Sequence, residues 1–187
     1  MMEDMAGKID GIFDGGDCRV GVESTIIDLT VTPPRLLRPG GLPLEKLREV
    51  LGEVAVDKAV LGKMAEGEKP RAPGMKYRHY APKAPVTVVC GDAEKTAAYI
   101  LSHRGEKTGI ICFSEYEAAF APNPTQSLGS VCDEAEHAHR VFDALRSFDS
   151  VDVTEIYAQC PTASGLGLAV SNRLKKAAGF CVVEVEG

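Results

Sequence analysis

Two short stretches of this sequence carry residue types that could handle a ligand bearing phosphate. Arg38 is followed by Pro-Gly-Gly at 39–41; a guanidinium group can pair with two phosphate oxygens at once, and glycine lets a backbone approach closely. Residues 76–80 read Lys-Tyr-Arg-His-Tyr and combine cations, hydrogen-bonding tips and aromatic faces, which suits a flap over a nucleotide. Each stretch also has a plain structural interpretation: a surface arginine at a strand end, and a linker docked against one domain.

The distribution of charge points to the same part of the chain. The 187 residues hold 21 basic and 27 acidic side chains, a net charge of −6. Counted by segment, the net charge is −5 over residues 1–33, +5 over 34–85 and −6 over 86–187. A cationic middle between acidic flanks suggests that an anionic ligand is handled there, although a solvated linker would have the same composition.

Several other classes of site are disfavoured. The six cysteines include no Cys-x-x-Cys pair, so neither a zinc knuckle nor a disulfide framework is predicted. His137 and His139 lie two apart on a predicted helix and would point to opposite sides, which argues against a metal site. No apolar run reaches the roughly 18 residues of a membrane span, and the first residues do not resemble a signal peptide. A cytoplasmic location is therefore expected, with no membrane contact.

The prolines divide the chain into a linker and the segments with regular secondary structure on either side of it. Eight of the 11 prolines lie between Pro33 and Pro85, and residues 57–85 show little sustained periodicity. That segment is predicted to be an ordered linker or lid, since long loops in compact domains are usually functional. Before it, the pattern predicts strands at 24–30 and 35–38 and a helix at 44–51 begun by Pro43.

After the linker, β-rich runs alternate with helical patterns. Strands are predicted at 86–90, 108–113, 154–158 and 180–185, a weakly extended run at 126–128, and helices at 93–103, 115–120, 133–148 and 166–178. This alternation predicts a mostly parallel sheet with helices on both faces, a Rossmann-like α/β domain over 86–187. Gly165 and Gly167 open the last helix, but the dinucleotide fingerprint is incomplete there, so a capped helix start is favoured over a phosphate cradle.

Several motifs, in order along the chain, resemble one enzyme family. Gly-Lys-Ile-Asp-Gly-Ile-Phe-Asp-Gly-Gly at 7–16, Gly-Val-Glu-Ser-Thr-Ile-Ile-Asp at 21–28 and Leu-Leu-Arg-Pro-Gly-Gly at 36–41 resemble the end of a YrdC-type domain. Ala-Pro-Gly-Met-Lys-Tyr-Arg-His-Tyr-Ala-Pro at 72–82 resembles the interdomain linker of the two-domain L-threonylcarbamoyladenylate synthases, and residues 165–178 are similar to the last helix of their Rossmann-like domain.

The resemblance implies a division of the chain and a reaction. Residues 1–56 would be the C-terminal part of a YrdC-type α/β domain, 57–85 the interdomain linker or lid, and 86–187 the Rossmann-like domain. In that family, L-threonine and bicarbonate give a carbamate that attacks the α-phosphate of ATP, forming threonylcarbamoyl-AMP and pyrophosphate. Mg²⁺ would accompany ATP, with no protein ligand identified. The product would pass to tRNA threonylcarbamoyltransferase proteins that modify adenosine 37, and the acidic net charge agrees with no direct tRNA binding here.

The resemblance also assigns expected ligand residues. Ser24 would contact L-threonine, because a hydroxyl can donate to a carboxylate and accept from an ammonium group; a strand serine in a half-buried sheet fits the same pattern. Thr25 is a further candidate, and no catalytic residue is assigned. Arg38 would contact ATP. From the linker, the expected ATP contact is Tyr77, with Lys76, Arg78 and His79 as further lid contacts.

The resemblance also implies that this chain lacks part of the family's active site. The family's N-terminal nucleotide-binding half has no counterpart before Met1, so we expect a C-terminal portion that is inactive alone. About fifty residues rarely bury enough surface to fold without help, which agrees with residues 1–56 being part of a larger domain. The alternative is that residues 86–187 form a non-catalytic regulatory or interaction module.

Overall fold

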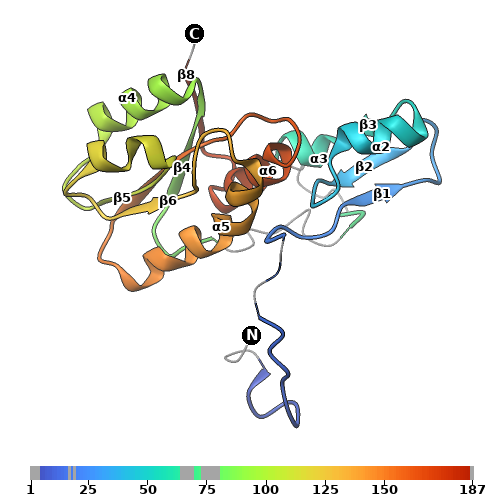
Figure 1. Ribbon diagram of the computed structural model, residues 1–187, viewed down its shortest axis with the longest axis horizontal. Helices are drawn as coiled ribbons and strands as arrows, with labels where there is room; N and C mark the ends of the chain where they lie inside the picture. The colour runs from blue at the N-terminus through green and yellow to red at the C-terminus, as the bar shows by residue number, and fades with distance from the viewer. Residues whose placement is uncertain (1–4, 17, 19, 64–69, 73–80, 186–187) are drawn as a thin grey trace.

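Two separate β-sheets lie toward opposite sides of the molecule, with a helix of the larger sheet's domain between them (Figure 1). The computed structural model describes residues 5–16, 18, 20–63, 70–72 and 81–185. The last strand of the small sheet ends at Val56 and the first strand of the large sheet begins at Val86. The domain boundaries at 56/57 and 85/86 stay predictions.

The large sheet has five strands, all parallel. They are β4 (Val86–Gly91), β5 (Thr108–Cys112), β6 (Thr125–Ser127), β7 (Glu155–Gln159) and β8 (Val182–Val185), in the spatial order β6-β5-β7-β4-β8. The connecting helices are α4 (Ala93–His103), α5 (Glu134–Ser147) and α6 (Gly167–Ala177), with 3₁₀ segments η1 (Ser114–Phe120) and η2 (Phe148–Ser150). The predicted parallel α/β sheet is confirmed.

Neighbouring strand residues feed two cores, one on each face of this sheet. Val88 packs in a cluster with side chains of α5 and α6, whereas Val89 packs with Ala97 and Ile100 of α4. Successive strand side chains point to opposite faces, so an uninterrupted apolar strand needs cover on both sides. Helices on both faces, as predicted, supply that cover.

The small sheet has three strands in the order β1-β2-β3. Strands β1 (Ile26–Asp28) and β2 (Arg35–Arg38) are antiparallel, and β3 (Ala55–Val56) runs parallel to β2. Helix α2 (Leu44–Leu51) buries Leu44 and Leu47 against Leu36 and Val54, and Leu168 of α6 packs on the edge of that cluster. The two sheets are thus joined by packing as well as by chain connection.

The prediction for the start of the linker was incomplete. A four-residue helix, α3 (Lys58–Leu61), begins after Asp57, whose carboxylate accepts a hydrogen bond from the Ala59 amide at 3.0 Å. Together with the two residues of β3, it is too short to produce a readable hydrophobic period, so the sequence pattern missed both. The helix predicted at 115–120 is the 3₁₀ segment η1. Across the described ranges, no helix combines the length and apolar character needed to cross a membrane.

Candidate functional site

The structure brings Ser24 and Arg38 together. Ser24 lies two residues before β1 and Arg38 is the last residue of β2, and the antiparallel register sets Ile26 opposite Arg38. The Arg38 Nε donates a hydrogen bond to the Ser24 carbonyl oxygen at 3.0 Å. Ser24 is exposed and Arg38 is half-buried, so the expected threonine and ATP residues lie side by side near the surface.

The glycine turn after Arg38 packs against the Ser24 segment. A Cβ added at Gly40 would lie 2.1 Å from the Glu23 carbonyl oxygen and 2.6 Å from the Ser24 carbonyl carbon. The Gly41 amide donates to that Glu23 carbonyl at 3.1 Å. The close approach expected at Gly40 is therefore an approach of the chain to itself, which fixes the two segments relative to each other.

The two hydroxyl residues of this segment differ in their partners. Thr25 Oγ1 donates to the Leu42 carbonyl at 2.8 Å and accepts from the Leu42 amide at 2.9 Å. No hydrogen bond to Ser24 Oγ is found within the part of the chain that the structure describes. Thr25 thus ties the two segments together, whereas the Ser24 side chain is exposed.

Charged groups from α6 surround these segments. Arg173 is 4% exposed, and its Nε lies 2.5 Å from Glu23 Oε2. Lys176 is also buried; burial lowers the pKa of its ammonium group to about 8, the Arg173 and Arg38 charges act in the same direction, and Glu23 opposes them. A carboxylate and three cations therefore meet at the junction of the two sheets.

Sequence reasoning missed Glu23, Arg173 and Lys176 as members of this cluster. Glu23 and Arg173 are 150 positions apart, and no local pattern links them. One signal was available, since helical spacing places Ala169, Arg173 and Lys176 on neighbouring positions of one helix side. Charged residues beside a buried alanine indicate a polar contact within the fold.

The start of α6 is occupied by carboxylates of the chain itself. The Leu166 amide donates to Glu134 Oε2 at 2.9 Å, and the Gly165 amide donates to Glu45 Oε1 at 3.4 Å. A Cβ at Gly165 would lie 2.2 Å from Glu134 Oε2. These contacts support the capped helix start and leave the phosphate-cradle interpretation without support.

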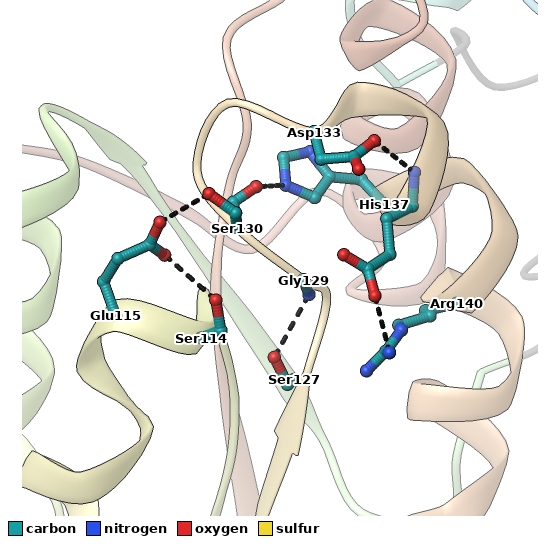
Figure 2. A network of polar contacts seen from close by, with 9 residues as sticks. Ser114, Glu115, Ser127, Gly129, Ser130, Asp133, His137 and Arg140 are labelled. Carbon is teal, nitrogen blue, oxygen red and sulfur yellow. Dashed lines mark hydrogen bonds and ion pairs between the residues drawn. The ribbon is translucent and has the colours of Figure 1, made fainter.

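A second polar cluster lies where β5 and β6 end, the edge at which open parallel sheets usually bind ligands (Figure 2). Glu115 accepts hydrogen bonds from the Ser130 hydroxyl at 2.6 Å, the Val131 amide at 3.1 Å and the Ser114 hydroxyl at 3.3 Å. The Ser130 hydrogen bond is the main reason that the pKa of Glu115 lies below its usual range. These hydrogen bonds give the Glu115 carboxylate three partners within the chain and fix the β6–α5 loop.

The two histidines of α5 differ in burial, as expected for side chains two positions apart on a helix. His137 is fully buried, its Nε2 lies 2.7 Å from the Ser130 carbonyl oxygen, and its ring packs against Phe113. His139 is exposed on the other side of α5. Among the described residues, no group of three or more His, Cys, Asp or Glu side chains is placed to hold a metal ion.

The predicted lid residues Lys76, Tyr77, Arg78 and His79 lie outside the described residues. Their proximity to Ser24 and Arg38 stays a prediction. The described part of the site consists of the Ser24 and Arg38 segments and the α6 side chains behind them.

Comparison with known proteins identifies the family. A family model described as "Threonylcarbamoyl-AMP synthase, C-terminal domain" matches residues 42–179, and one described as "Telomere recombination" matches residues 1–40. The chain is 47% identical over 189 aligned residues to the threonylcarbamoyl-AMP synthase of Pyrococcus abyssi, covering 98% of this chain and 53% of that protein. The Bacillus subtilis threonylcarbamoyl-AMP synthase is 40% identical, with 96% and 52% covered.

A solved structure agrees with these sequence matches. The crystal structure of P. abyssi Sua5 complexed with L-threonine superposes with a TM-score of 0.85 at 45% identity, covering 99% of this chain and 54% of that one. The chain spans about half the length of the curated relatives it matches. Since one family model covers most of its residues, the chain belongs to the threonylcarbamoyl-AMP synthase C-terminal domain family.

Proposed function

We propose that this chain takes part in the synthesis of threonylcarbamoyl-AMP from L-threonine, bicarbonate and ATP, with pyrophosphate as the second product. Relatives of that name at 40–47% identity support the proposal, as does the L-threonine bound in the P. abyssi structure. The observation that carries it is the 3.0 Å hydrogen bond from Arg38 Nε to the Ser24 carbonyl, which holds the expected threonine and ATP residues next to each other.

This adjacency suits the chemistry. The threonine amine forms a bond to the bicarbonate carbon and water leaves; a carbamate oxygen then attacks the α-phosphorus while the bond to the pyrophosphate oxygen breaks. Such a transfer depends on positioning and on cations that offset developing negative charge. In the proposal, the Ser24 hydroxyl binds threonine and the Arg38 guanidinium binds ATP phosphate oxygens. No residue is assigned as the catalytic base.

The remaining contacts follow from the family. Tyr77 would cover ATP, with Lys76, Arg78 and His79 nearby in the linker. ATP would bind as its magnesium complex. Among the described residues, no cluster of carboxylates or histidines fits the ion, so the proposal gives magnesium no protein ligand. The product would pass to tRNA threonylcarbamoyltransferase proteins in the cytoplasm for modification of adenosine 37, without direct tRNA binding by this chain.

The test is pyrophosphate release with ATP, magnesium, L-threonine and bicarbonate. We expect no threonine-dependent release from this chain alone, and release once it is mixed with the part of the P. abyssi relative that it does not match. Ser24→Ala and Arg38→Ala should each abolish the restored activity, whereas Arg140→Gln, on an exposed part of α5, should not.

Two outcomes would change the proposal. Threonine-dependent release by the chain alone that disappears in Arg38→Ala would keep the reaction and overturn the expected inactivity. The opposite outcome is no pyrophosphate release by the chain alone or by the mixture, with L-threonine and ATP binding unaffected by both alanine substitutions. That result would favour a non-catalytic regulatory or interaction module.

A further inference from the structure

The guanidinium group of Arg173 joins the two segments that carry the expected ligand residues. Its Nε donates to Glu23 Oε2 at 2.5 Å, and its Nη2 donates to the Pro39 carbonyl oxygen at 3.4 Å. Glu23 directly precedes Ser24, and Pro39 directly follows Arg38. One side chain from the middle of α6 therefore contacts each segment one residue away from its ligand residue.

This bridge lies inside the molecule. Arg173 is 4% exposed, and its Nη1 also donates to Asn172 Oδ1 at 3.0 Å, while Asn172 Nδ2 donates to the Val60 carbonyl at 2.8 Å. A buried guanidinium group is tolerated only where hydrogen bonds and an opposite charge compensate the loss of water. The Asn172-Arg173 pair thus contacts α3 and the segments that flank β1 and β2, and both side chains are fixed by several partners.

Direct hydrogen bonds also join the two segments, at residues within three positions of the Arg173 contacts. The Gly41 amide donates to the Glu23 carbonyl at 3.1 Å, and the Leu42 amide donates to Thr25 Oγ1 at 2.9 Å. Arg173 adds contacts to the Glu23 side chain and the Pro39 carbonyl. Removing the guanidinium group would leave the Glu23 carboxylate without this partner at a 26% exposed position, so both segments would shift.

We propose that Arg173 is a positioning residue for the candidate site, through which the C-terminal domain sets the spacing between Ser24 and Arg38. Arg173 acts through Glu23 and Pro39 and does not itself touch substrate. The identity of the ligands rests on the proposed function, whereas the positioning is a property of the fold. Helix α6 of the large sheet's domain would thereby position residues that lie beside the small sheet.

The first test measures position without any ligand. In the full chain, Arg173→Gln should speed hydrogen–deuterium exchange of the Gly41 and Leu42 amides by about tenfold or more, with little change at the Ile110 and Ile156 amides of the large sheet. Glu23→Gln, which keeps an acceptor oxygen, should give a smaller effect at the same two amides.

The matched control is Arg140→Gln. Arg140 also lies 2.5 Å from a carboxylate, Glu136, but its side chain is 46% exposed on α5, so its loss should not change exchange at Gly41 or Leu42. Wild-type exchange at these amides in Arg173→Gln, or one uniform increase over the whole chain, would overturn the proposal. If Arg173→Gln does not fold, Glu23→Gln and Arg173→Lys give the same comparison, because lysine cannot hold both contacts with one planar fork.

The second test uses the pattern of ligand affinities of the full chain. Ser24→Ala should weaken binding of L-threonine and Arg38→Ala binding of ATP, whereas Arg173→Gln should weaken both by a similar factor in the folded protein. Wild-type affinity for both ligands in Arg173→Gln would overturn the positioning role. Absence of binding to either ligand by the wild-type chain, even when it is mixed with the part of the P. abyssi relative that it does not match, would count against the proposed function. The exchange experiment would still decide the role of Arg173.

Discussion

At the scale of single residues, the site depends on a close approach between two loops. Gly40 lies so near the Glu23 and Ser24 backbone that a Cβ would be 2.1 Å from a carbonyl oxygen. Gly40→Ala should therefore separate the loops, lower stability by about 1–3 kcal/mol and weaken binding of both ligands. Gly62→Ala is the control, because Gly62 has extended backbone and open space around it. Equal urea-unfolding curves for the two variants would contradict this account.

Lys176 gives a prediction about pH. Its pKa is about 8 in the folded chain because it is buried beside Arg173 and Arg38, and near 10.5 when unfolded. Between these values the unfolded chain binds more protons, so the free energy of unfolding contributed by this group rises with pH. Lys176→Met should remove that rise and should be more stable than the wild type near neutral pH.

The measurement compares denaturant unfolding of the wild type and Lys176→Met at about pH 7.5 and about pH 9.5. The stability advantage of the variant should shrink as the pH increases. An advantage of the same size at both values would show that the Lys176 ammonium is not destabilised by its surroundings.

At the scale of elements, one buried side-chain amide joins strand β7, the residue after β5 and helix α4. Gln159, at the end of β7, accepts from the Phe113 amide at 3.0 Å and donates to the Ala93 carbonyl and to Thr96 Oγ1, both at 2.8 Å. Gln159→Leu would leave the Phe113 amide without its acceptor, whereas the Thr96 hydroxyl would keep its 2.9 Å hydrogen bond to the Ala93 carbonyl. The substitution should cost about 1–3 kcal/mol in unfolding free energy.

The control for this substitution is Gln126→Leu. Gln126 lies half-buried on the edge strand β6, and the described structure gives its side chain no hydrogen bond, so thermal unfolding should change little. A loss of stability as large as that of Gln159→Leu would mean that the amide network is not what stabilises the sheet.

The sequence predicted helices and strands correctly where a hydrophobic period and a residue that marks the end of an element occur together. Helix α4 begins at the predicted residue because Asp92 caps it, accepting from the Glu94 amide at 2.9 Å. Strand β2 and helix α2 also match their predicted residues. Strand β3 and helix α3 were missed because two and four residues cannot show a period. Their positions are set by pairing with β2 and by the Asp57 cap.

At the scale of the whole molecule, exposed apolar surface gathers on the half that contains the small sheet. Residues 5–16 form an arm that runs away from both sheets (Figure 1); Phe13 on that arm is fully exposed, and Val50 of α2 is 84% exposed. The chain should therefore bind a hydrophobic dye, and Phe13→Ser with Val50→Ser should reduce the fluorescence. Leu101→Ser, a 38% exposed residue of α4, should have little effect; equal reductions would contradict this assignment.

Contacts between distant parts of the chain could not be predicted from the sequence. Ser24 and Arg38 follow from short motifs, and strand pairing brings them together. The Arg173–Glu23 contact joins positions 150 residues apart, and only the packing of α6 against the small sheet creates it. A motif can therefore indicate candidate ligand residues, but a contact such as Arg173–Glu23 is set by tertiary packing.

The most direct test of the account is a backbone-amide NMR titration of the 187-residue chain with L-threonine and with magnesium ATP. We expect shifts at residues 23–25 and 38–42, with the threonine response lost in Ser24→Ala and the ATP response lost in Arg38→Ala. Shifts confined to the carboxyl edge of the five-stranded sheet, or responses unchanged in both variants, would contradict it.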